Sequence, residues 1–275
     1  MMKLGLIFLP LLFVGCSKVG VGYSLGTSQI KSRVDDAFEF SPRSKNKEVD
    51  QFLSAEFAKN KKIFFVKLKE QLQKVEALTL KEQISTAEGN VFHKDVVSFQ
   101  KEMILLFKPS FDKVIHEVSD AEIKVFKEYT DEQISEKEEE AADKKSFKKK
   151  KLANFERIAE FFLDDLSKDQ EKLMENFFDE HLNFYTEQIQ MRKIFNADLI
   201  KLYPQKDKML DLSLAYYSGD NSIRTDTYKK QREIFENDFK NFILEIWKIR
   251  SPEQKAYFQK RLKDILHEVD KILTQ

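Results

Sequence analysis

The sequence predicts an all-α protein, built as an elongated bundle of roughly seven to nine amphipathic helices behind a flexible N-terminal tether. Charged residues make up 34% of the 275 residues, whereas only seven glycines and five prolines interrupt the chain. Many charges and few helix breakers favour long amphipathic helices. From Ser41 onward apolar residues recur every three or four positions, as on one face of a helix, and no useful stretch alternates as a strand does.

The start of the chain has the layout of a secretory signal, because Lys3 is followed by an apolar run over residues 4–14. The run is too short to span a bilayer as a helix. The sequence Phe13-Val14-Gly15-Cys16 resembles a bacterial lipobox, in which a peptidase cuts before the cysteine and the sulfur receives a diacylglycerol. Residues 1–15 are therefore predicted to be a lipoprotein signal peptide, with lipidation at Cys16. The alternative is an uncleaved hydrophobic N-terminus with a buried cysteine.

Cys16 is the only cysteine of the chain, so its lipidation leaves no thiol for an internal disulfide or for catalysis. Two or three acyl chains would hold the protein on a membrane, since each buried methylene contributes about 0.8 kcal/mol. Ser17 follows the cysteine, and by resemblance to sorted lipoproteins of Gram-negative bacteria it favours the outer membrane, facing the periplasm. The sequence thus predicts a lipid-anchored protein of the bacterial cell envelope.

Residues 16–40 are predicted to hold the lipidated cysteine, the tether and one short helix. Three of the seven glycines fall within residues 17–27, SKVGVGYSLGT, as is typical of a flexible linker. The short helix is expected over Gln29–Phe40, and a helical domain over residues 41–275.

The helical domain is expected to start at Ser41-Pro42, a cap followed by proline at the first helical position. One apolar stripe follows, made of Val49, Phe52, Leu53, Phe57, Phe64, Leu68, Leu72 and Val75. Thr79 and Glu82 have the spacing of a capping box for the next helix. Gly89 and Asn90 are expected to interrupt that helix, which runs through Phe107 and meets Pro109.

A Ser-x-x-Glu/Gln signature occurs three times further along the chain. In such a capping box the serine oxygen accepts a hydrogen bond from an N–H in the first helical turn, and the Glu or Gln side chain accepts one from the serine N–H. The copies predict three helix starts: Ser119 with Glu122, Ser167 with Gln170, and Ser251 with Gln254.

Residues 136–151 place an acidic block directly before a basic one, with Glu140 and Lys144 at the favourable spacing of a helical ion pair. One interpretation of this segment is a docking patch for anionic lipid or for a peptidoglycan-associated partner. The other is a solvated helix or hinge without a partner. Three more helices are expected after it: Ile189–Tyr203 before Pro204, Thr225–Ile249 after a break at residues 216–222, and a last one from Ser251 to near Leu273.

Motifs for catalysis, metals and cofactors are missing from the sequence. The four histidines, His93, His116, His181 and His267, form no H-E-x-x-H motif and no close pair. Asp112 with His116 and Asp264 with His267 stand a helical turn apart, but a di-iron bundle needs Glu-x-x-His motifs, which the chain lacks. Lys+Arg and Asp+Glu both total 47, so no net basic charge attracts nucleic acid. We therefore expect no enzyme, no metal or cofactor and no nucleic-acid partner.

Phenylalanine is the unusual component, with 25 residues beside a single tryptophan. One interpretation is a Phe-rich surface that binds apolar clients, as a holdase chaperone would need. The other is that phenylalanine fills the core of a helical protein, which fits its recurrence at helical spacing.

Several segments resemble known families. The opening GCSKVGVGYSLGTSQIKSRVDDAFEFSP (15–42) resembles a group of helical lipoproteins of Gram-negative bacteria that is catalogued only as a domain of unknown function; VSDAEIKVFKEY, LSKDQEKL and RSPEQKAYFQKRLKDI resemble its later segments. That resemblance implies a helical architecture and a lipid anchor, but no activity. Leu166 to Gln170 also resembles the L-T-x-x-Q motif of small periplasmic helical chaperones. The predicted function is a non-enzymatic binding or structural module of the envelope, and the alternative is a periplasmic holdase.

Overall fold

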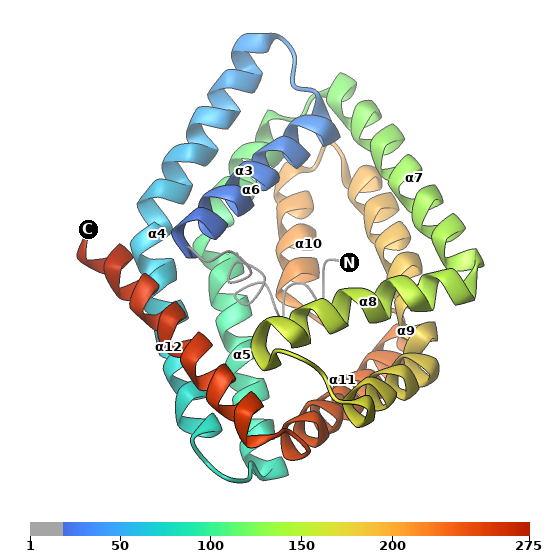
Figure 1. Ribbon diagram of the computed structural model, residues 1–275. Helices are drawn as coiled ribbons and strands as arrows, with labels where there is room; N and C mark the ends of the chain where they lie inside the picture. Colours follow the sequence, from blue (N-terminus) through green and yellow to red (C-terminus); the bar gives the residue numbers. More distant parts are fainter. Residues whose placement is uncertain (1–18) are drawn as a thin grey trace.

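The computed structural model describes residues 19–275; the predicted signal peptide and the Cys16 lipidation site lie outside them. The described chain is a bundle of helices without strands (Figure 1). Its ten helices are α3 (Val19–Phe38), α4 (Arg43–Thr79), α5 (Thr86–Leu106), α6 (Lys108–Glu117), α7 (Asp120–Ala142), α8 (Lys144–Leu163), α9 (Lys168–Leu202), α10 (Lys206–Ser218), α11 (Asp226–Lys248) and α12 (Pro252–Thr274). The all-α prediction is confirmed, but the predicted count of roughly seven to nine helices is too low.

Two breaks raise the count. Pro109 was expected to end a helix, yet it stands in the first turn of the short helix α6, where a proline costs no hydrogen bond. Asp143 divides residues 136–151, ending α7 and capping α8 through Ser146 N–H at 3.1 Å. The acidic and basic blocks therefore lie on two helices, and Glu140 pairs with Lys150 across the corner at 2.6 Å instead of with Lys144.

The predicted tether is wrong for residues 19–27, which form the first half of α3. Tyr23 explains why a glycine-rich segment is helical here. Its ring packs 5.2 Å from Phe64 and 5.3 Å from Phe65, and its hydroxyl donates to the Phe57 carbonyl at 2.8 Å. Burial of Tyr23 offsets the low helix propensity of glycine, and Gly20 lets α12 approach closely, with Ile272 at 3.3 Å from the position of a Cβ.

Three further expectations in the first half of the chain need correction. Thr79 does not cap a new helix; it ends α4, and its hydroxyl donates back to the Val75 carbonyl at 2.9 Å. The capping box of α5 is instead Ser85 with Glu88, and α5 continues through Gly89 without interruption. Ser41 is not the cap of α4, because Pro42 occupies that position and the Ser41 N–H donates to Glu122.

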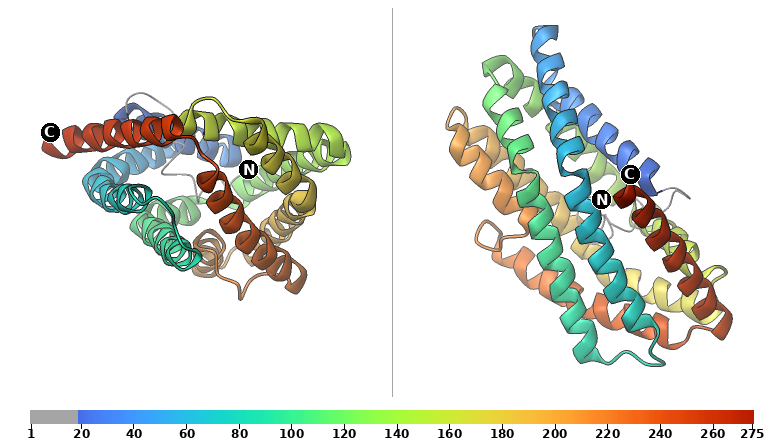
Figure 2. Two further views of the ribbon diagram at one scale, coloured as in Figure 1. Left: turned by 60° about the horizontal axis from the view of Figure 1, so that its bottom comes forward. Right: turned by 90° about the vertical axis from the view of Figure 1, so that its left-hand side faces the viewer.

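The long helices form the frame of the molecule. α4 packs against α12, and α9 packs against α7, α8 and α11. In Figure 1, α5, α6 and α10 lie towards the back of the molecule, whereas α3, α8 and α12 lie towards the front. Both views of Figure 2 place α3, α8 and α12 on the same side of the molecule.

Phenylalanine fills the core. The larger of two buried clusters is formed mainly by α8, α9 and α11, and the smaller one by α3, α4 and α12. Stacked rings join the helices, with Phe184 and Phe235 at 4.1 Å and Phe177 and Phe242 at 4.6 Å between centroids. Every phenylalanine among residues 19–275 is buried or half-buried.

Candidate functional site

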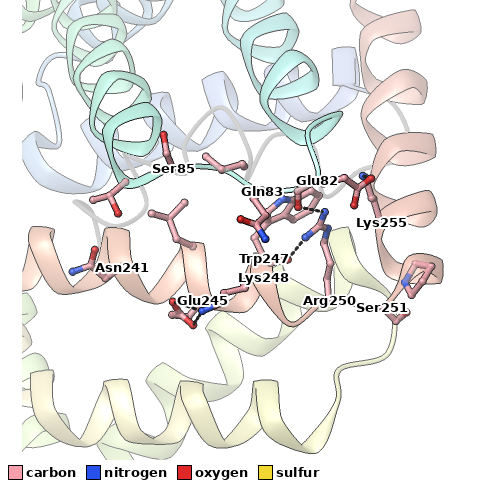
Figure 3. A pocket seen from close by; sticks show the side chains of 14 residues that line it. Glu82, Gln83, Ser85, Asn241, Glu245, Trp247, Lys248, Arg250, Ser251 and Lys255 are labelled. Atoms are coloured by element: carbon pink, nitrogen blue, oxygen red, sulfur yellow. Dashed lines mark hydrogen bonds and ion pairs between the residues drawn. The ribbon is translucent and has the colours of Figure 1, made fainter.

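A cleft of about 750 Å³ opens where three segments meet: the loop between α4 and α5, the end of α11, and the start of α12 (Figure 3). Glu82 and Ser85 line it from the loop, Trp247 and Lys248 from α11, and Arg250 from the corner before α12. These segments are far apart in the sequence, and the helix packing of α4, α5, α11 and α12 brings them together.

Arg250 holds the corner of the cleft together. Its guanidinium lies over the Trp247 ring, 4.1 Å from the centroid, and donates to the carbonyl oxygens of Trp247 and Glu82. Burial lowers the pKa of this guanidinium, but an arginine stays charged at any ordinary pH. The α4–α5 loop is therefore fastened to the end of α11 by one side chain.

Two buried donors in the wall of the cleft lack an acceptor within the described part of the chain. They are the indole Nε1 of Trp247 and the Nε of Arg250. Trp247 is only 8% exposed, and buried polar groups are nearly always hydrogen-bonded in folded proteins. These two polar atoms of residues that line the cleft thus have hydrogen-bonding capacity that the described chain does not use.

The rim of the cleft carries charges of both signs. Lys255 pairs with Glu82 at 2.8 Å, and this hydrogen bond lowers the pKa of Glu82. Ser85 and Ser251 stand at the N-caps of α5 and α12, so two helix N-termini with their partial positive charge border the cleft. An aromatic ring, an arginine and two helix starts can bind an acceptor group.

The three predicted caps stand at helix starts. Ser167 and Ser251 accept from the N–H of Gln170 and Gln254, respectively, and Glu122 accepts from the N–H of Ser119 at 2.7 Å. The spacing of the motifs therefore located the starts of α7, α9 and α12.

The two glutamine boxes also meet in space, which their spacing alone did not predict. The Gln170 amide donates to Gln254 Oε1 at 3.1 Å, and the Gln254 amide donates to Gln170 Oε1 at 2.9 Å. Each Oε1 also accepts the N–H of its own serine, and Gln254 donates to the Asp165 carbonyl at 2.7 Å. This buried glutamine pair fixes the start of α12 directly behind the cleft.

Glu122 makes a different set of contacts. Lys45 and the N–H of Ser41 both reach its carboxylate, so this box ties α7 to the start of α4. The third box is thus a structural joint away from the cleft.

Two of the four histidines contact carboxylates. His181 is buried, with the tilted ring of Phe177 at 4.5 Å between centroids and Asp238 at 3.4 Å, while the exposed His116 lies 3.2 Å from Asp112. Within residues 19–275 no group of three His, Cys, Asp or Glu side chains is placed to hold a metal ion. None of the described helices has the length and apolar character needed to cross a membrane.

Sequence reasoning missed Trp247 and Arg250. One signal was present, because the single tryptophan stands three residues before the Arg-Ser-Pro-Glu-Gln segment. Nothing in the sequence indicated that the loop between α4 and α5 would form another wall of the same cleft.

No protein-family model matches the sequence, and comparison with curated proteins and with solved structures found no match either. The resemblances to helical envelope lipoproteins and to L-T-x-x-Q chaperones therefore stay predictions.

Proposed function

We propose that this protein is a lipid-anchored, non-enzymatic binding module of the bacterial envelope, and that the cleft between the α4–α5 loop and the α11–α12 corner is its binding site. The observation that carries the binding role is the Trp247–Arg250 pair, whose buried indole Nε1 and guanidinium Nε lack an acceptor among residues 19–275. Tryptophan and arginine are the residues that most often dominate the free energy of protein–protein contacts.

The anchor is the lipobox-like sequence that ends at Cys16. Ser17 favours the outer membrane, with the helical body facing the periplasm. Labelled palmitate should enter the wild-type protein and be absent from the Cys16→Ala variant, which should accumulate as uncleaved or soluble precursor. Incorporation into Cys16→Ala would show that the lipid is attached elsewhere or that no lipobox operates.

The ligand class follows from the donors. An extended polypeptide segment offers carbonyl oxygens at regular intervals, and its apolar side chains can lie on Leu244 and Ile84 in the same cleft. Gln83 from the α4–α5 loop and Trp247 from α11 both line this cleft (Figure 3).

A photo-crosslinking amino acid placed at Lys248, on the exposed rim, tests the cleft in cells. The same group at the exposed Lys201 of α9 is the matched control. We expect one dominant protein adduct from position 248 and none from 201, identified by mass spectrometry. Equal adducts from both positions would remove the cleft from the proposal.

The alternative function is a holdase that presents phenylalanine to unfolded clients. It needs a contiguous apolar surface larger than several hundred Å². The six phenylalanines proposed for such a surface, Phe57, Phe64, Phe177, Phe178, Phe239 and Phe242, are all buried, with at most 8% exposed. This burial supports the binding module over the holdase, and many unrelated unfolded adducts in the crosslinking experiment would reverse that preference.

A further inference from the structure

We propose that the face formed by α3, α8 and α12 lies flat against an anionic phospholipid bilayer, with the first half of α3 at the contact. The proposal rests on the lipid anchor at Cys16. It adds an orientation: the helical body is held on the membrane surface and does not hang from a tether.

The chain leaves little room between lipid and body. Only Ser17 and Lys18 separate Cys16 from Val19, so the three connecting residue steps span at most about 11 Å. Val19 is 2% exposed and belongs to the smaller core cluster. A lipid on Cys16 therefore places the first turn of α3 at the level of the lipid headgroups.

The surface of α3 suits that position. No charged side chain occurs from Val19 to Ile30. Val21 and Leu25 stand one turn apart on the side away from the buried Gly22 and Tyr23, and they are 45% and 51% exposed. Two exposed apolar side chains on an uncharged helix face can enter the headgroup region without burying a charge.

Helix α8, which packs against α12 as α3 does, supplies positive charge. It contains seven basic and two acidic residues. Lys145, Lys149 and Arg157 are exposed, and no ion-pair partner of theirs occurs within the described chain. The acidic block on the adjoining end of α7 is partly neutralised, because Glu140 pairs with Lys137 and Lys150, and Glu138 pairs with Lys193.

The three helices share one side of the molecule. α12 packs against both α3 and α8, and all three lie in front of the other helices in Figure 1 and on one side in both views of Figure 2. α12 adds the exposed Lys260 and Lys263. A chain with zero net charge thus gathers basic side chains on the face that begins next to the lipid, which is the pattern that attracts anionic phospholipid.

Leu25→Cys tests the contact in the mature lipoprotein reconstituted into vesicles. Because Cys16 is acylated, the new cysteine is the only thiol that takes the environment-sensitive dye NBD. In vesicles of phosphatidylethanolamine with phosphatidylglycerol, we expect blue-shifted emission and quenching by a nitroxide-labelled lipid. Leu105→Cys on α5, at the rear of the bundle and 59% exposed, is the control and should show neither effect.

Charge reversal separates orientation from simple anchoring. Lys145→Glu with Lys149→Glu should lower the ratio of quenched to unquenched label at position 25 at least about five-fold, the effect of one lysine at an anionic surface. Lys201→Glu with Lys208→Glu, exposed on α9 and α10, should leave it unchanged. Equal quenching at positions 25 and 105, or no response to either charge reversal, overturns the orientation while leaving the anchor intact. Labelling of the unaltered protein would reveal a thiol at Cys16 and overturn the anchor and the orientation together.

Discussion

Glu122 shows how one buried carboxylate can join three parts of a chain. It accepts hydrogen bonds from the Ser119 N–H at 2.7 Å, from the Ser41 N–H at 3.1 Å and from the Lys45 ammonium at 2.7 Å. Burial of this side chain, which is 3% exposed, would raise the pKa of Glu122, but the hydrogen bonds from these donors outweigh burial and hold the pKa at about 2.

Glu122→Gln should lower the free energy of unfolding by about 2 to 3 kcal/mol at pH 7, because Lys45 is left without its charge partner. The folded-state pKa lies below the ordinary 4.5, so the contribution of Glu122 is complete above pH 4.5 and is lost as the pH falls towards 2. Urea denaturation of both proteins across this range measures it. The exposed Glu128→Gln on the same helix is the control, and a Glu122→Gln deficit that persists at pH 2 would contradict the ion-pair account.

Lys151 carries its positive charge in a largely buried position, which disfavours that charge. Its ammonium lies between two rings, 4.6 Å from the centroid of Phe147 and 5.0 Å from that of Tyr185. Burial lowers the pKa of Lys151 to about 8, whereas the attraction of the rings for a cation acts in the opposite direction.

Lys151→Met should therefore stabilise the protein by about 1 to 2 kcal/mol at pH 7, the burial cost of about 3 kcal/mol less the attraction of the rings. Between pH 8 and 10.5 the unfolded chain binds more protons, so the wild type gains stability with rising pH and the advantage of methionine disappears. Thermal unfolding of both proteins at pH 7 and above pH 10 checks this. Lys149→Met, on the exposed side of α8, should show no such gain, and destabilisation by Lys151→Met would mean that the two rings outweigh burial.

At the scale of helices, the glutamine pair explains why two of the boxes carry glutamine and the third glutamate. An amide both donates and accepts, so Gln170 and Gln254 can face each other and still bond to their own serines. Two glutamates there would oppose each other oxygen to oxygen. Glu122 faces donors only and needs no donor of its own.

A double-mutant cycle tests the pair. Gln170→Ala and Gln254→Ala should each cost about 2 to 3 kcal/mol, since each leaves a buried amide without its partner. The double variant should cost less than the sum by about 1 kcal/mol or more. Urea denaturation of the four proteins gives the coupling. Additive losses would mean that the two amides do not interact. The control is Ser85→Ala, which removes an exposed cap. It should cost only about 1 kcal/mol and show no coupling energy with Gln170→Ala or Gln254→Ala.

Local chemistry determines which elements the sequence could predict. Capping boxes and chain breaks depend on neighbouring residues, so the sequence shows them. The breaks predicted at Pro204 and Gly219 lie close to the ends of α9 and α10. The tether predicted where α3 begins was wrong because of a contact with residues far away in the sequence. Its glycines favour a linker, and the helix forms because Tyr23 packs against α4, a contact that no local pattern contains.

At the scale of the whole molecule, the pairing of helices was beyond the sequence. Amphipathic faces indicate that helices pack, but many helices with similar apolar stripes leave the partners open. The cleft depends on such a pairing, because Arg250 must reach the Glu82 carbonyl from the far end of the chain. The sequence shows the residues that line the cleft, but it does not show that they come together in space.

Phe258 offers a test of whether the two core clusters fold as one unit. It packs against both, with its ring 5.1 Å from Trp247 in the larger cluster and 5.6 Å from Phe162 in the smaller one. Phe258→Ala should lower the free energy of unfolding by about 2 to 3 kcal/mol, less than for a fully buried phenylalanine. Because Phe107 also packs against both clusters, Trp247 fluorescence and far-UV circular dichroism should still report a single coincident transition in this variant. Lys260→Ala, an exposed neighbour on α12, should change neither signal, and two separate transitions in either protein would show that the clusters unfold independently.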